Sequence, residues 1–215
     1  MDRRSFAQCN LDLFLNTFIR DKKGGFFCEC GAADGIEISS CLFFEKFLGW
    51  TGINVEASPS LFTRLQDNRP NSINIHAALS YQDGNVPFYP CWDSSGQETG
   101  CGSVSCDTKF IDYLSSVGHR RATDPVMIPT LSFGTLCKKC MVKTIDLFVL
   151  DVEGHELEVL KGVAETDNHL WPNMFCIEHG HVGIDALRKT LSLMNYDFLT
   201  VDPCDINAIF VKRQQ

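Results

Sequence analysis

The sequence predicts an α/β fold: a Rossmann-like sheet of seven strands, with helices on both faces and an antiparallel hairpin at the C-terminal end. Two observations predict a largely parallel sheet. Short apolar runs alternate with stretches whose apolar residues recur at helical spacing, and the run Ile145–Leu150 is apolar almost throughout, as in a central parallel strand. The third observation is that the extended runs 196–201 and 208–212 have no helix between them, so they must pair antiparallel.

The first third of the chain is expected to alternate helices with strands. Asn10 and Ser58 each precede a stretch with helical spacing, and their short polar side chains are expected to cap the helices that begin there. Gly49 is a typical residue just past a helix end. In chain order we expect a helix within residues 1–23, a strand at 26–28, a helix at 39–48, a strand at 51–55, a helix from 59 and a strand at 72–78.

Residues 82–126 have a different character, because they are rich in Gly, Ser and Pro and show little apolar periodicity. A long irregular segment within a compact domain is usually either functional or disordered. We expect this one to be a substrate lid. Regular structure resumes after it, with strands at 145–150 and 173–177 and helices at 155–161 and 184–194, and residues 1–215 are expected to form a single domain.

The charge balance excludes some partners. The 215 residues include 27 acidic and 19 basic side chains, a net charge of -8, without a basic cluster. Such a surface repels phosphate groups, so we expect neither a nucleic acid nor an anionic membrane as partner. No run reaches the roughly 18 apolar residues of a membrane span, and we expect a cytoplasmic protein. The oligomeric state is left open.

Eleven cysteines are many for this length. Most lie in apolar runs, where cysteine behaves as a small hydrophobic residue, and in a reducing cell we expect free thiols rather than disulfides. Cys137 and Cys140 have the spacing of half a zinc site, for which Cys91, Cys101 and Cys106 are conceivable partners. A single CxxC is weak support for zinc, so free thiols are favoured here too.

The first two strands end in residues that suit an adenosine ligand. Strand one runs into Glu29-Cys-Gly31, and glycine permits both a tight turn and close approach of a ligand. Strand two ends at Glu56, whose carboxylate can accept hydrogen bonds from both hydroxyls of a ribose. Dinucleotide sites require a G-x-G-x-x-G loop, but Ala33 and Ile36 stand at its second and third glycine positions. S-adenosylmethionine has no phosphate and carries an ammonium group that Glu29 could attract, so it is favoured over NAD.

Three segments also resemble the FkbM-type methyltransferases: Gly25-Phe-Phe-Cys-Glu-Cys-Gly-Ala-Ala-Asp-Gly35, Leu48-Gly-Trp-Thr-Gly-Ile-Asn-Val-Glu-Ala-Ser-Pro59 and Ile145-Asp-Leu-Phe-Val-Leu-Asp-Val-Glu-Gly-His-Glu156. The resemblance implies a class I methyltransferase fold, S-adenosylmethionine as donor and O-methylation of hydroxyls on sugars or natural products. Asp151, Glu153 and Glu156 match the family's D-x-E-G-x-E motif. The expected donor-binding residues are Glu29, Gly31, Ala32, Asp34, Gly35, Glu56, Ala57, Ala78 and Asp151.

The reaction requires help with the acceptor's proton, because an aliphatic alcohol has a pKa roughly as high as that of water, about 16. Polar groups follow the strands at 145–150 and 173–177, where the sulfonium would point. If the chain stays extended, Asp151 and Glu153 share one side, and either His155 or His179 could be the general base. The same groups could instead hold a divalent cation. The expected catalytic residues are Asp151, Glu153, His155, Glu178 and His179.

The sequence leaves the acceptor open between a small molecule and a glycan. It also leaves open an alternative function, in which the chain keeps the methyltransferase-like fold but serves as a binding module without activity.

Overall fold

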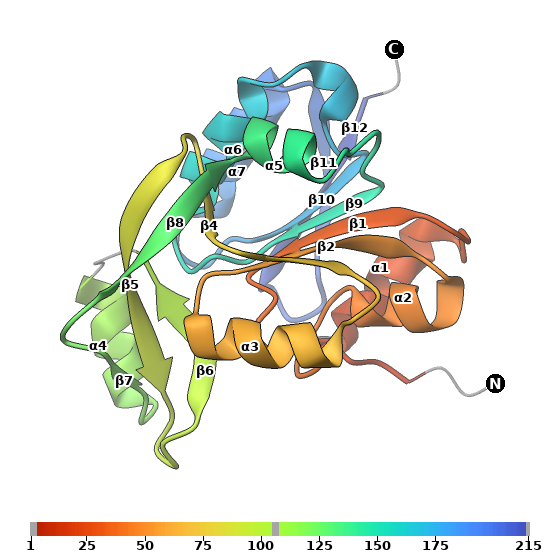
Figure 1. The fold of residues 1–215 in the computed structure, drawn as a ribbon. Helices are drawn as coiled ribbons and strands as arrows, with labels where there is room; N and C mark the ends of the chain where they lie inside the picture. The colour runs from red at the N-terminus through yellow and green to blue at the C-terminus, as the bar shows by residue number, and fades with distance from the viewer. Residues whose placement is uncertain (1–3, 105–107, 214–215) are drawn as a thin grey trace.

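A seven-stranded sheet forms the centre of the computed structural model, which describes residues 4–104 and 108–213 (Figure 1). In spatial order its strands are β11 (Tyr196–Val201), β12 (Asn207–Lys212), β10 (Met174–Glu178), β9 (Leu147–Leu150), β1 (Phe26–Cys30), β2 (Thr51–Glu56) and β3 (Ile73–His76). Strand β12 runs antiparallel to both of its neighbours, and the remaining pairs are parallel. The predicted sheet and its terminal hairpin are confirmed.

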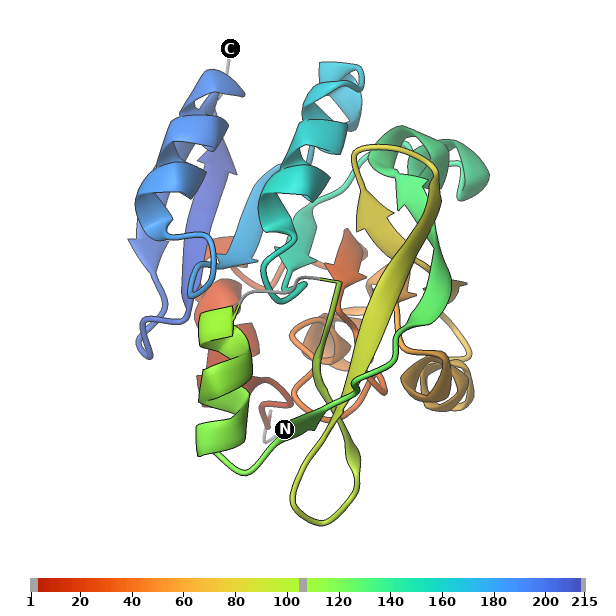
Figure 2. The ribbon, with the colours of Figure 1, turned by 90° about the vertical axis from the view of Figure 1, so that its left-hand side faces the viewer.

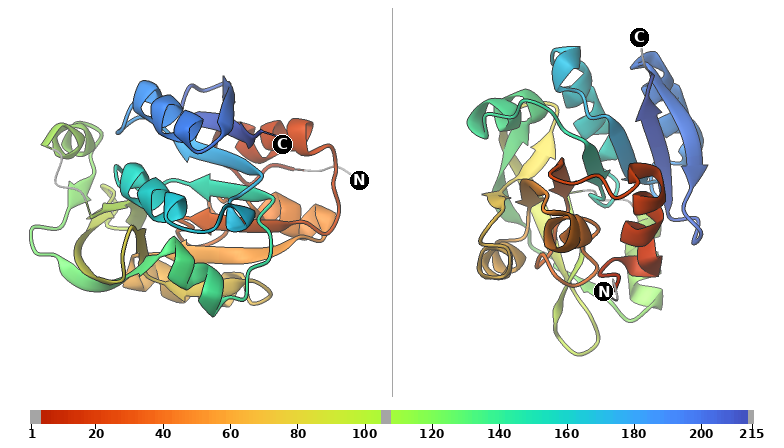
Figure 3. Two further views of the ribbon diagram at one scale, coloured as in Figure 1. Left: turned by 90° about the horizontal axis from the view of Figure 1, so that it is seen from above. Right: turned by 90° about the vertical axis from the view of Figure 1, so that its right-hand side faces the viewer.

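The strand order reverses direction between β1 and β9. From β1 the chain steps through β2 to β3 at one edge, and it then returns to β9 and proceeds through β10 to the hairpin at the other edge (Figure 3). In open α/β sheets such a reversal opens a crevice at the carboxyl ends of the strands, and ligands bind there. The ends of β1, β2 and β9 are therefore the first place to look for a site.

Helices cover both faces of this sheet, as expected. One face carries α1 (Leu11–Ile19), α2 (Leu42–Leu48) and α3 (Pro59–Asn68), and the other carries α5 (Phe133–Lys139), α6 (Glu156–Ala164) and α7 (Ile184–Leu193) (Figure 1). Two short 3-10 helices, η1 (Gln8–Asn10) and η2 (Asn168–Leu170), lie in connections.

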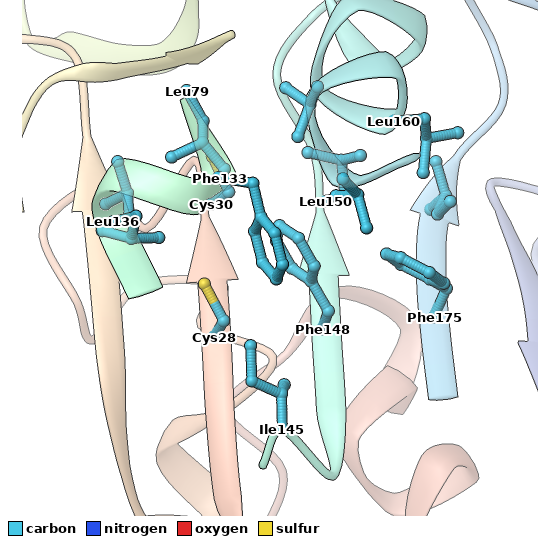
Figure 4. Close-up of a cluster of buried hydrophobic side chains, with 14 of the residues drawn as sticks. Cys28, Cys30, Leu79, Phe133, Leu136, Ile145, Phe148, Leu150, Leu160 and Phe175 are labelled. Carbon is cyan, nitrogen blue, oxygen red and sulfur yellow. The ribbon is translucent and has the colours of Figure 1, made fainter. Parts of the chain in front are cut away.

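The central strand β9 is apolar throughout because both of its faces are buried. Phe148 and Leu150 belong to the core under α5, α6 and α7, and Leu147 and Val149 belong to the core under α1 and α2. In the first core, the Phe148 ring lies 5.8 Å from that of Phe133 and 5.4 Å from that of Phe175 (Figure 4). Complete burial of one such side chain stabilises the fold by roughly 1.5–3 kcal/mol.

Residues 82–126 are largely regular, so the expectation of an irregular segment was wrong. They form most of a second sheet, in the order β4-β8-β5-β6 with β7 beside β5, and one helix (Figure 2). Pro87 and Pro90 within β5, and Gly100 and Gly102 within β6, disfavour strands and hide the pattern. The elements of the second sheet, together with the helix, are β4 (Ala78–Ser80), β5 (Gly84–Trp92), β6 (Glu98–Ser103), α4 (Thr108–Ser116), β7 (Arg120–Arg121) and β8 (Val126–Ser132).

Two expectations about local structure had mixed outcomes. Ser58 caps α3 by accepting a hydrogen bond from the Leu61 amide at 3.4 Å, as predicted. Asn10 is left-handed, with φ 58°, and its side chain makes no capping hydrogen bond. The buried carboxylate of Asp12 instead accepts hydrogen bonds from the Phe6 amide at 2.7 Å and the Leu13 amide at 2.8 Å.

The expectation of free thiols fails at one pair, since Cys9 and Cys204 form a disulfide. It connects η1 to the turn between β11 and β12, 195 residues away in the sequence. Cys137 and Cys140 have free thiols, as do Cys91 and Cys101, whereas Cys106 lies outside the described residues. Within residues 4–104 and 108–213, no helix has the length and apolar character needed to cross a bilayer.

Candidate active site

A cavity opens at the carboxyl ends of β1, β2 and β9, where the strand order reverses. About 440 Å³ of space in it, open solvent included, is free of protein atoms. The second sheet closes its other side. The lining residues are Cys30, Gly31, Val55, Glu56, Ala57, Ala77, Ala78, Leu79, Phe88, Gly100, Gly102, Ser103, Val104, Asp151, Val152, Glu153 and His155.

Gly31 forms the floor of the cavity, where the chain turns out of β1. Its φ is 84°, and a Cβ at this position would lie 1.8 Å from the Asp151 carbonyl oxygen. Its amide donates to the Val55 carbonyl at 3.0 Å, which ties the turn to β2. Glycine is therefore required here both for the left-handed backbone and for the close approach of two strand ends.

We expect Gly31→Ala to lower the free energy of unfolding by roughly 2 kcal/mol, because backbone strain and overlap with Asp151 add together. Gly49→Ala is the matched control. Gly49 is also left-handed, with φ 67°, but a Cβ there meets nothing within 4 Å. Urea unfolding of both variants measures the difference, and equal losses of stability would show that the close contact with Asp151 is unimportant.

Glu56 lies at the end of β2 and lines the cavity, and the residue is 6% exposed. One carboxylate oxygen accepts a hydrogen bond from the Ala33 amide at 2.8 Å, and the other accepts one from the Ser58 amide at 2.7 Å. Burial raises the pKa of Glu56 from 4.5 to about 7, although these amides oppose the shift. The carboxylate is thus held rigidly between two loops and retains lone pairs for a ligand.

Glu29, the expected partner of the donor's ammonium group, is not among the residues that line the cavity. Its side chain is 3% exposed and lies on the same face of β1 as Phe27, toward α2. The carboxylate accepts hydrogen bonds from the Ser39 hydroxyl at 2.9 Å and the Ser40 amide at 2.6 Å. Buried Arg69 lies 3.7 Å from it. In this conformation Glu29 holds the segment before α2, and burial raises its pKa despite these partners.

The other expected donor residues divide into two groups. Ala57 and Ala78 line the cavity. Ala32, Asp34 and Gly35 do not; they shape the loop that follows β1. The Asp34 carboxylate accepts hydrogen bonds from the amides of residues 36 and 37, at 3.0 and 2.9 Å, and Gly35 has φ 79°.

Asp151 and Glu153 both line the cavity, but the chain between them is not extended as assumed. Glu153 is left-handed, with φ 53°. Buried Glu156 curls this loop, because its Oε1 accepts hydrogen bonds from the Val152 and Gly154 amides at 3.1 Å each. Non-glycine residues in this conformation cost free energy and occur often at functional sites.

Three carboxyl groups and one histidine meet beside the cavity. Glu153 Oε2 lies 2.9 Å from His181 Nε2, and Glu178 Oε2 lies 3.8 Å from the same nitrogen. Burial, reinforced by the charges of Asp151 and Glu153, raises the pKa of Glu178 to about 10. Burial also raises the pKa values of Asp151 and Glu153. A hydrogen bond to Glu178 opposes the rise in the pKa of Asp151, but the effect of burial is larger.

Neither of the two histidines expected as candidate bases belongs to this cluster. His155 lines the cavity, with its Nε2 3.1 Å from the Ser80 hydroxyl, and burial lowers its pKa, which favours the neutral ring. His179 is directed away, toward the β11–β12 turn, with its Nε2 3.4 Å from Asp205. The structure therefore brings His155 to the cavity and excludes His179 from it.

Two residues of the site were missing from the expected set. His181 replaces His179 beside the carboxylates, and the Phe110 ring from α4 packs edge-on against it at 4.4 Å. The signal for His181 was its i,i+3 spacing from Glu178, which brings two side chains together in a turn. Phe110 had no recognisable signal, because it lies in the segment expected to be irregular.

Comparison with known proteins identifies similar chains. A family model described as the methyltransferase FkbM domain matches residues 29–198. The hexuronic acid methyltransferase AglP of Haloferax volcanii is 29% identical over 136 residues, which cover 63% of this chain and 49% of that protein. The chain thus spans about half the length of this curated relative.

Two solved structures share the fold. Methyltransferase FkbM from Methylobacillus flagellatus KT superposes with a TM-score of 0.54 at 14% identity, covering 89% of this chain and 44% of that one. The methyltransferase domain of METTL16 superposes with a TM-score of 0.55 at 10% identity, covering 96% of this chain and 67% of that one.

Proposed function

Because the chain belongs to the FkbM methyltransferase family, we propose that it transfers a methyl group from S-adenosylmethionine to a hydroxyl oxygen of a sugar or a small natural product. The observation that carries this proposal is Glu56, which is buried at the end of β2 and lines the cavity beside the glycine turn of β1.

We place the donor's adenosine between the carboxyl ends of β1 and β2, on the side of the cavity that Glu56 lines. Glu56 accepts hydrogen bonds from the two ribose hydroxyls, since its carboxylate keeps free lone pairs after binding two amides. Ala57, Ala78 and Leu79 offer an apolar wall to the adenine. Gly31 lets the ligand approach the backbone. This orientation directs the methionine part toward Asp151, on the far side of Gly31.

The acceptor then lies over the carboxyl ends of β9 and β10, where Asp151 and Glu153 reach the cavity. In the transfer, a lone pair of the acceptor oxygen forms the new C–O bond while the C–S bond breaks. The sulfur keeps the bonding pair and leaves as a neutral thioether. Asp151 accepts the hydrogen bond of the acceptor hydroxyl and then its proton. Holding the three reacting atoms in line supplies much of the rate.

Residues 82–126 are proposed to cover this acceptor. Phe88, Gly100 and Gly102 from this segment line the cavity, and Phe110 packs on His181. A segment that lines a cavity can exclude water from the reaction. A sugar acceptor is supported by AglP, whose name gives a hexuronic acid as its substrate.

The test uses S-adenosylmethionine with an isotopically labelled methyl group and a panel of acceptors: free hexuronic acids, neutral sugars and hydroxylated natural products. Labelled product from at least one hydroxyl acceptor is the expected result. Donor binding without transfer to any acceptor would instead support a binding module.

The donor's affinity should depend on pH through Glu56. Its pKa near 7 means that the carboxylate is mostly protonated at pH 6 and mostly ionised at pH 8. Because the ribose hydroxyls donate to the ionised form, we expect binding to tighten about tenfold between these pH values. The contribution of Glu56 to folding stability changes with pH in the opposite direction. Its raised pKa stabilises the folded state fully below pH 4.5, and this stabilisation is lost as the pH rises through 7. Calorimetry at both pH values checks the affinity, and Glu56→Gln should remove the change.

A further inference from the structure

The carboxylates beside the cavity have an arrangement that ordinary ion pairing does not explain. Within the described residues, no Lys or Arg forms an ion pair with Asp151, Glu153 or Glu178. No described group donates a hydrogen bond to the buried Glu178 Oε2. Glu29 in the same protein shows the usual solution, with a buried arginine and three donors around one buried carboxylate. Among the described residues, the cluster at β9 and β10 has no such partner, and its ion-pair contacts are those with the His181 imidazole.

The geometry of the cluster matches that of ligands around one ion. Two ligands at about 2.1 Å from a cation lie about 3.0 Å apart when adjacent and about 4.2 Å apart when opposite. His181 Nε2 lies 2.9 Å from Glu153 Oε2 and 3.8 Å from Glu178 Oε2. One ligand atom from each of the three residues lies within 4.8 Å of the other two. A small inward shift of these side chains would place all three ligand atoms at coordination distance from one ion.

The surroundings also suit a metal site that stays open to a substrate. The side chains of Glu153, Glu178 and His181 are 15%, 17% and 15% exposed, so protein encloses them on most sides and leaves one side free. Phe110 fixes the plane of the His181 ring by an edge contact. Glu153 lines the cavity. Three protein ligands and a free side are the usual arrangement of catalytic metal sites.

We propose that Glu153, Glu178 and His181 form a binding site for a divalent first-row cation, with Mn²⁺ as the representative ion. Mixed carboxylate and imidazole donors suit such ions. The role of the ion rests on the proposed function: it binds the acceptor's hydroxyl oxygen and lowers the pKa of that hydroxyl, and the proton passes to Asp151. Acceptors with two adjacent oxygens, such as a sugar diol or a hydroxy acid, can then chelate the ion.

The experiment titrates Mn²⁺ into the EDTA-treated full chain and follows free Mn²⁺ by electron paramagnetic resonance. The wild type is expected to bind one equivalent. Glu178→Gln and His181→Gln are each expected to weaken binding by at least about 10–100-fold. The matched control is His179→Gln, since His179 lies two residues from His181 but faces Asp205, and it should bind as the wild type does. Melting curves check the folding of each variant, and the two ligand variants test the site independently.

Wild-type binding of no Mn²⁺ up to millimolar concentration would overturn the proposal, and so would unchanged binding in a folded ligand variant. The demethylated donor, S-adenosylhomocysteine, is titrated separately in EDTA. If it binds there while Mn²⁺ does not bind, the metal site is wrong and the donor site stands. If Mn²⁺ binds as expected while the nucleoside does not, the metal site stands and the donor site is wrong.

Discussion

Asp151→Asn should lower kcat by about 10²–10⁴-fold while changing the dissociation constant of S-adenosylmethionine less than about threefold. The side chain follows β9 where the strand order reverses, and it lines the cavity on the acceptor side. Asparagine has nearly the same shape but cannot take a proton from an alcohol. Steady-state kinetics with a methyl acceptor and calorimetry with the donor measure the two effects on one preparation.

Asp146→Asn is the control for this variant, because Asp146 lies just before β9, at the end of the strand opposite to Asp151. Its carboxylate binds the Lys22 ammonium at 2.6 Å and the Phe26 amide at 3.0 Å. The Asp146→Asn variant should have the kcat of the wild type. A fully active Asp151→Asn variant would remove Asp151 from the chemistry, and an equal loss in donor affinity would make it a donor-binding residue instead.

Glu56→Gln should weaken binding of S-adenosylmethionine by about 100-fold, because hydrogen bonds to a charged group contribute roughly 1.5–3 kcal/mol each. The amide keeps one acceptor oxygen but loses the charge and the second oxygen. Calorimetry at pH 8, where wild-type Glu56 is ionised, gives the largest difference. The variant's kcat at saturating donor should stay within a few-fold of the wild type, since the ribose is remote from the reacting atoms.

Glu98→Gln is the matched control for Glu56. The Glu98 carboxylate binds the Ser58 and Ser60 hydroxyls close to Glu56, but it does not line the cavity. Donor affinity should be nearly unchanged in this variant. Equal effects at positions 56 and 98 would mean that the loop after β2, and not the Glu56 carboxylate, controls binding.

The main sheet could be predicted from the sequence because each of its strands has a strong local signal. Ile145–Leu150 is apolar because both faces of β9 are buried, and Ser58 followed by Pro59 marks the start of α3. The second sheet could not be predicted, because its prolines and glycines are tolerated only through pairings distant in sequence. Strand β5 pairs with β8 from Gly84 opposite Thr130 to Phe88 opposite Val126, contacts that no local pattern encodes.

At the site, the sequence predicted which strand ends border the cavity, but it did not predict which side chains face the cavity. Strand alternation explains where Glu29 and His179 lie. Glu29 shares the face of Phe27 and so turns toward α2. His179 continues the ladder with β12 through its amide, which donates to the Ile206 carbonyl at 3.0 Å, so its side chain leaves the face of Glu178. His181 lies beyond the strand, where the chain turns back toward Glu153.

The most direct measurement is a crystal structure of the protein with S-adenosylhomocysteine. We predict that both ribose hydroxyls lie within hydrogen-bond distance of the Glu56 carboxylate, with the adenine against Ala78 and the sulfur on the Asp151 side of Gly31. Nucleoside density at another place, or a cavity between β1 and β2 that stays empty at saturating ligand, would contradict the account.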